Sequence, residues 1–373
     1  MKNSKEKCLT KTIIILIICT VASCADYSSS IFITVKLKEQ IGHAVEIKAS
    51  DLINNIHYVP LETSKESLVG EIIKIIPTNN HFFISDDFNT LSVWTKEGKY
   101  INHIGRRGQG PGEYITLSDF DISTDNEIVY ILDESKSQIH LYSFKNDYVK
   151  SIKINKLISN IMKTPFGIIC YQDPLVMINK YGEQIPTLVL LNDNGEEIGI
   201  LHQRNVSTKF MPPFTHPAIL KKHNNSFYYY PPFQDTIYSI QADTITPEFV
   251  IDKGKYSISI SEIESLEQMR RAYQTGIVVQ NFEINSHYLI LHCQRNNELE
   301  LYIYDILKGQ LINISGEDFS STIVNDIDHS FNIFPICLFN NQIIEIKNAH
   351  EIDNVPTDIQ PDDNPILRVS SCK

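Results

Sequence analysis

Short apolar-rich segments follow one another in sets of four along this chain, and this regularity constrains the fold more than any other feature. The first set comprises Glu71–Pro77, His81–Ser85, Leu91–Thr95 and Lys99–Ile104. A second set begins about 45 residues further on and comprises Leu117–Ile122, Glu127–Leu132, Gln138–Phe144 and Tyr148–Ile154. Turn-forming residues such as Asn79 and Asn80 separate the segments. Four strands per unit at this period predict the blades of a β-propeller and not a two-sheet sandwich.

Four further units continue the pattern. The third runs from Ile158 through Thr187–Leu191 and Glu196–His202. The fourth contains Ala218–Lys222, Phe227–Tyr230, Thr236–Gln241 and Ile245–Ile251. The fifth contains Val278–Glu283, Tyr288–Cys293, Leu299–Tyr304 and Gln310–Ile314. The sixth contains only Phe334–Phe339, Gln342–Lys347 and Pro365–Val369.

The sixth unit therefore lacks a fourth strand, whereas Asn55–Leu61 near the N-terminus belongs to no unit. Pairing the two would close the ring and remove the exposed edges that sheet proteins must otherwise protect. The sequence thus predicts an all-β fold, a six-bladed β-propeller closed by an N-terminal strand.

One helix is expected within the propeller. Ser261 and Glu264 have the spacing of a capping box, and Gly276 could end the helix. Apolar residues recur between them at helical spacing, at Ile263, Leu266, Met269 and Tyr273. We expect an amphipathic helix of about three turns against the outside or one mouth of the ring.

The first 23 residues have the features of a secretion signal. Lysines at 2–11 precede the uncharged run Ile13–Cys19, which is shorter than the roughly 20 residues that a membrane-spanning helix needs. The small residues Val21–Ser23 then precede Cys24, and this arrangement resembles the lipobox of bacterial lipoproteins. The resemblance implies a signal peptide at 1–23 and a lipidated tether at 24–30 that begins with acylated Cys24. The pattern of four-strand units assigns 31–373 to a single propeller domain.

The mature sequence resembles the six-bladed β-propeller lipoproteins of Bacteroidetes, which are distantly related to NHL-repeat propellers. The residues that carry the likeness are Tyr58–Thr63, Ile104–Tyr114, Asp235–Tyr238 and Asp363–Pro365. The resemblance implies a lipid-anchored protein of the cell envelope, at the outer membrane, facing either the periplasm or the cell surface. It implies no particular biochemical activity.

Charge and cysteine spacing argue against several partners. The formal net charge is −12, which disfavours nucleic acid because phosphate backbones are repelled. No C-x-x-C pair exists among the cysteines beyond the signal, and the twelve histidines show no metal-binding spacing. We therefore expect no metal and no cofactor. No G-x-S-x-G element of a hydrolase is present either.

The glycine-rich stretch Gly105–Tyr114 lacks the spacing of a phosphate-binding loop. A blade-to-blade crossover is the structural interpretation, since Gly can adopt positive φ and Pro fixes its own φ. The functional alternative places its polar side chains at a mouth of the ring, where they meet a ligand carboxylate or hydroxyls. The candidate binding residues in this stretch are Arg106, Arg107, Gln109, Glu113 and Tyr114.

Two aromatic–proline elements, at 211–214 and 227–233, provide further candidates. Exposed aromatic rings could stack on sugars, whereas packing in the β core is the structural alternative. The candidates are Phe214, Tyr229 and Phe233.

Three functions remain open. The preferred one is non-catalytic binding of a glycan, a peptide or a partner envelope protein at a channel mouth. The second is a propeller enzyme, such as a glycoside hydrolase, lyase or lactonase, with carboxylates or histidines converging at the channel. The third is a structural scaffold of an envelope complex.

Overall fold

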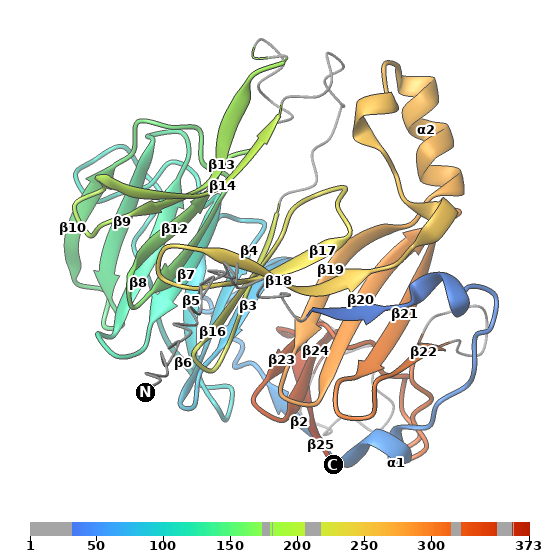
Figure 1. The fold of residues 1–373 in the computed structure, drawn as a ribbon. Helices are drawn as coiled ribbons and strands as arrows, with labels where there is room; N and C mark the ends of the chain where they lie inside the picture. Colours follow the sequence, from blue (N-terminus) through green and yellow to red (C-terminus); the bar gives the residue numbers. More distant parts are fainter. Residues whose placement is uncertain are drawn as a thin grey trace, which may run out of the picture. The chain divides into compact units, whose positions relative to one another are not determined.

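The computed structural model describes residues 32–173, 180, 182–205, 218–314, 322–348, 360 and 362–373. Six sheets, each with four antiparallel strands, form a six-bladed β-propeller (Figure 1), and one of the sheets carries a fifth strand. In five of the blades the four strands follow one another along the chain and neighbour one another in the sheet, as the sequence predicts.

Blades are numbered here from the first complete unit of the sequence. Blade 1 contains β3 (Ile72–Pro77), β4 (His81–Asp86), β5 (Leu91–Thr95) and β6 (Tyr100–His103). Blade 2 contains β7 (Asp119–Ser123), β8 (Ile128–Asp133), β9 (Gln138–Ser143) and β10 (Tyr148–Lys153). Blade 3 contains β11 (Asn160–Thr164), β12 (Gly167–Tyr171), β13 (Gln184–Leu191) and β14 (Glu197–Asn205).

Blade 4 contains β15 (Ile219–His223), β16 (Ser226–Tyr230), β17 (Thr236–Ile240) and β18 (Ile245–Ile251). Blade 5 contains β19 (Val278–Ile284), β20 (Tyr288–Arg295), β21 (Glu298–Asp305) and β22 (Gln310–Ile314). Blade 6 contains β23 (Cys337–Phe339), β24 (Gln342–Lys347), β25 (Ile366–Cys372) and the N-terminal strand β2 (Ile53–Pro60).

The ring closes as the sequence predicts. Strand β2 pairs antiparallel with β25, with Tyr58 opposite Arg368 and Val59 opposite Leu367. The side chain of Asn364 then fixes the chain that leaves β2, because its amide nitrogen donates to the carbonyls of Glu62 and Ser67 at 2.8 and 2.7 Å. These contacts give the motif residues Tyr58–Thr63 and Asp363–Pro365 a structural role.

The N-terminal segment also covers blades 4 and 5. Strand β1 (Ile33–Val35) adds to the outer edge of β18 in parallel, which makes blade 4 five-stranded. The chain continues through the 3-10 turn η1 (Leu37–Glu39), a bridge between Val45 and Ile314 of blade 5, and the short helix α1 (Ala49–Leu52). In Figure 1, α1 lies beside the C-terminus, where the Lys373 amide donates to the Leu52 carbonyl at 2.9 Å. Strand β1 was not predicted, since three residues carry too little periodicity.

Six clusters of buried apolar side chains lie between the blades, one at each pair of neighbours. Because the sixth cluster joins the last blade to the first, the hydrophobic core is itself a closed ring. Representative pairs, from junction 1–2 round to junction 6–1, are Phe83 with Phe120, Leu141 with Ile168, Tyr171 with Tyr229, Ile237 with Phe282, Ile303 with Leu338, and Leu367 with Trp94.

Two helical turns, η4 (Gly254–Tyr256) and η5 (Ile260–Glu262), and the helix α2 (Leu266–Thr275) lie in the crossover from blade 4 to blade 5. The predicted helix therefore exists, but its predicted start at Ser261 is wrong. Ser265 is the N-cap, with its hydroxyl accepting from the Gln268 amide at 3.2 Å. The chain offers two consecutive capping boxes, Ser261–Glu264 and Ser265–Gln268, and the later one is used because Ile260 and Ile263 pack in an apolar cluster before the helix begins.

Because the strands of each blade are antiparallel, its crossovers and the turn between its second and third strands lie at the same end of the sheet. This crossover end carries the glycine-rich segment and α2. The opposite end carries short turns such as Asn79 and Asn340, whose side-chain amides lie 3.4 Å apart.

Candidate functional site

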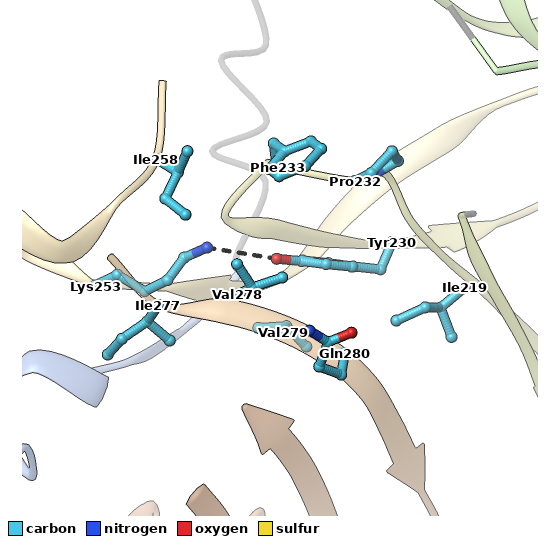
Figure 2. A pocket seen from close by; sticks show the side chains of 10 residues that line it. All are labelled: Ile219, Tyr230, Pro232, Phe233, Lys253, Ile258, Ile277, Val278, Val279 and Gln280. Carbon is cyan, nitrogen blue, oxygen red and sulfur yellow. Dashed lines mark hydrogen bonds between the residues drawn. The ribbon is translucent and has the colours of Figure 1, made fainter. Parts of the chain in front are cut away.

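A small cavity of about 70 Å³ lies at the crossover end, between blades 4 and 5. Figure 2 shows its lining side chains, which come from β15, β16, the turn after β16, the crossover and β19. Most of the lining is apolar, with Ile219, Ile258, Ile277 and Val279 among its walls. Three polar side chains, Tyr230, Lys253 and Gln280, also face it (Figure 2).

Lys253 is the main charged group of the cavity wall and is only 2% exposed. Its ammonium donates to Asp235 Oδ1 at 2.7 Å and to the Gln234 carbonyl at 3.2 Å. Burial alone would lower the pKa of Lys253, but the neighbouring Tyr230 and Asp235 outweigh burial and raise that pKa above its ordinary value. Lys253 is therefore a paired cation, and the pair as a whole is neutral.

The remaining N–H donor of Lys253 makes only a long, weak hydrogen bond. It points to the Tyr230 hydroxyl across 3.5 Å, the dashed line of Figure 2, which is beyond the ordinary range for such a bond. The amide nitrogen of Gln280 donates to Gln294 Oε1 at 2.7 Å. Among the described residues, no donor reaches the Gln280 amide oxygen. The cavity thus offers one weakly used donor and one open acceptor.

Phe233 stands at the same cavity with an unusual backbone. Its φ is +56°, a conformation that a bulky side chain adopts only when the surroundings enforce it. Its ring packs edge-on against Tyr273 of α2, with centroids 6.1 Å apart. Met269 of the helix belongs to the same apolar cluster. The helix therefore packs against the strained turn that contributes Phe233 to the cavity wall.

The glycine-rich segment is held by its own side chains. The Glu113 carboxylate accepts from the Gly110 amide at 2.8 Å and pairs with Arg106. A Cβ at Gly108 would collide with that carboxylate, so a larger residue at this position would displace the Glu113 side chain. The structure therefore brings Arg106, Gly110 and Glu113 together. The hydrogen bond and Arg106 hold the pKa of Glu113 below its ordinary value.

The other candidates of this segment divide into exposed and buried residues. Arg107 and Gln109 are exposed at the crossover end. Tyr114 is only 2% exposed and belongs to the core between blades 1 and 2, so it presents no ring to a ligand. None of the residues of this segment is among the described residues that line the cavity between blades 4 and 5.

The two candidate residues of the aromatic–proline element at 227–233 lie in different environments. Phe233 lines the cavity, whereas Tyr229 is 0% exposed and packs between blades 3 and 4, as the packing alternative expects. Phe214 and Cys24 lie outside the residues that the structure describes. Sequence patterns gave no signal for Lys253 or Gln280, because the burial of a single lysine depends on tertiary packing.

Charged side chains join the first strands of the blades. Lys74 pairs with Asp119 at 2.7 Å, and Lys222 pairs with Asp121 at 2.5 Å. The inner carboxylates also accept from backbone amides of the next strand, as Asp119 does from Ile161 at 2.9 Å. A third pair, Lys221 with Glu283, links blade 4 to blade 5. These carboxylates are engaged in holding the blades together.

The described residues contain no group of three or more His, Cys, Asp or Glu side chains arranged to hold a metal ion. They also contain no helix with the length and apolar character to span a membrane. The cysteines described are free thiols, namely Cys170, Cys293, Cys337 and Cys372.

Comparisons with known proteins place the fold. The model of a family described as "Domain of unknown function (DUF4934)" matches residues 32–370. The crystal structure of a protein from Bacteroides fragilis described as exported is 19% identical, with a TM-score of 0.69 over 92% of this chain and 100% of that chain. A DUF4221-family structure from Bacteroides vulgatus is 8% identical, with a TM-score of 0.55 over 86% of this chain and 97% of that chain. No curated protein matches the chain. At these identities the solved structures show the shared fold alone.

Proposed function

Since this chain belongs to the DUF4934 family, whose description assigns no activity, we propose from its own geometry that it is a non-catalytic binding protein of the cell envelope. The observation that carries this proposal is the cavity at the crossover end, with its apolar walls, weakly used lysine donor and open glutamine acceptor. Rigid blades would present this site with little ordering cost on binding.

Location in the envelope is part of the proposal. The basic and apolar segments of 1–23 followed by Cys24 support export and acylation of the thiol. The similar Bacteroides fragilis protein is described as exported, which agrees with that location. The anchor would hold the propeller at the outer membrane, facing the periplasm or the cell surface.

Binding is preferred to catalysis because the inner carboxylates are committed to structural contacts. Asp119 and Asp121 each bind a lysine and a backbone amide of blade 3. Such carboxylates lack the freedom to act as a general acid or base on a ligand. The enzyme alternative predicts turnover of a glycan or lactone that survives removal of the cavity.

A binding survey tests the proposal with two matched variants. Ile219 and Leu220 are adjacent on β15, but Ile219 packs toward the cavity side and Leu220 toward blade 3. Glycan arrays, peptide libraries and purified envelope proteins are probed with wild type, Ile219→Phe and Leu220→Phe. We expect Ile219→Phe, which fills the cavity, to weaken binding at least tenfold, while Leu220→Phe stays within about threefold. Equal binding by wild type and Ile219→Phe would place the site elsewhere.

A further inference from the structure

The size of the cavity limits what can enter it. A volume of about 70 Å³ is well below the roughly 300–1,000 Å³ of sites that enclose a whole small molecule. At the roughly 10–15 Å³ that one water-sized group needs, it accommodates about five to seven such groups, which is enough for a branched aliphatic side chain. A sugar ring is too large for this space and would leave its hydroxyls against apolar walls. The occupant is therefore a small apolar group carried by a larger ligand.

The exposure of the lining side chains indicates where a ligand would enter the cavity. Lys253, Ile258 and Ile277 are buried, whereas three lining residues are only partly buried. These three are Ile219, Phe233 and Gln280. Because they come from β15, the turn after β16 and β19, the entrance lies between the first strands of blades 4 and 5 and the strained turn.

The two available polar groups specify the atoms next to that apolar group. Lys253 can donate to an acceptor that enters near its 3.5 Å contact with Tyr230, and Gln280 can accept from a donor. Asp235 already neutralises Lys253 at 2.7 Å, so a neutral carbonyl suits the site better than a carboxylate. An aliphatic group flanked by a carbonyl and an N–H is the chemistry of one residue in a peptide chain.

We propose that the cavity recognises a peptide segment through one branched aliphatic residue of valine, leucine or isoleucine type. Its side chain fills the apolar space, its carbonyl accepts from Lys253, and its N–H donates to the Gln280 amide oxygen. This inference rests on the proposed function and names the ligand class for the same site.

A host–guest peptide series tests the proposal. Peptides of the form acetyl-Gly-Gly-X-Gly-Gly-amide, with X as Gly, Ala, Val, Leu or Trp, are titrated with the full chain, and binding is followed by the chemical-shift changes of the peptide. We expect binding to tighten at least tenfold from Gly to Val or Leu, because each buried methyl or methylene group adds a favourable free energy of transfer out of water. Trp should bind no better than Gly, since its ring exceeds the cavity.

The backbone contacts are tested on the ligand, so that the protein fold is undisturbed. Methylation of the N–H at residue X should weaken binding at least fivefold by removing the donor for Gln280. Methylation of the N–H two residues before X serves as the matched control and should have little effect. Binding of the Leu peptide should also be lost in Ile219→Phe and kept in Leu220→Phe.

The outcomes separate this inference from the proposed function. Affinity that does not change from Gly to Leu, or that survives in Ile219→Phe, overturns peptide recognition at the cavity. If glycans bind and are lost in Ile219→Phe while every peptide fails, the site is a binding site but its ligand class is wrong. If nothing is sensitive to Ile219→Phe, both proposals fail.

Discussion

Among single residues, His292 shows how burial creates a dependence on pH. Its ring is 6% exposed, stacks on Phe334 with centroids 5.0 Å apart, and has a ring nitrogen with no hydrogen-bond partner among the described residues. Burial lowers the pKa of His292 to about 4 from its ordinary value of 6.5. The folded protein therefore holds this imidazole neutral at pH values where the unfolded chain protonates it.

We predict that the free energy of unfolding falls as the pH decreases from about 6.5 to about 4, with His292 contributing up to about 3 kcal/mol of the loss. The sign follows because the unfolded state binds the extra proton in this range. His292→Phe keeps an aromatic ring against Phe334 and should flatten part of the pH dependence, measured by urea unfolding at several pH values. The exposed His43→Phe is the control and should reproduce the wild-type slope. An unchanged slope in His292→Phe would show that the pKa of His292 does not differ between the folded and unfolded chains.

Cys24 carries the prediction about anchoring. If its thiol is acylated, wild type expressed in a Bacteroides host should partition into detergent and resist release by high salt, whereas Cys24→Ala should remain in the aqueous phase. Mass spectrometry of the mature N-terminus is the direct measurement. A mature protein that retains residues before Cys24 would contradict the anchor.

At the level of elements, the sequence identified most strands because alternation and turn residues are local signals. The predicted fifth-unit strand Gln310–Ile314 coincides with β22, and Asn55–Leu61 pairs where expected. The start of α2 was misplaced because two capping boxes fit equally well locally, and only packing selects between them. Of the candidate site, Phe233 was found from its aromatic–proline context, whereas Lys253 was missed because nothing in its neighbours reveals burial.

The capping assignment can be checked by a pair of serine variants. Ser265→Ala removes the acceptor for the Gln268 amide and should destabilise α2 by about 1 kcal/mol. Ser261→Ala changes the same residue type four positions earlier and should have a smaller effect, since it caps no helix here. Hydrogen exchange of the helix amides is the measurement, because a local helix can open without global unfolding. Equal protection in both variants would refute Ser265 as the cap.

At the scale of the whole molecule, the ring depends on pairing between its distant ends. Removing residues 1–31 should leave a chain that unfolds in one cooperative thermal transition. Removing residues 1–61 deletes β2, leaves β25 with an open edge and takes Val59 and Leu61 out of the cluster between blades 6 and 1. We expect the shorter chain to lose cooperativity and to associate, as seen by calorimetry and light scattering. A cooperative, monomeric transition in that chain would show that the ring does not need β2.

The pairing of β2 with β25 also sets an order of events during biosynthesis. Residues 53–60 leave the ribosome first and find their partner only after residues 366–372 have been made. Blades 1 to 5 can form sheets while synthesis continues, but blade 6 remains one strand short until β25 has been made. The ring therefore stays open during almost all of synthesis, and it can close only when the last strand of the chain pairs with one made near its beginning.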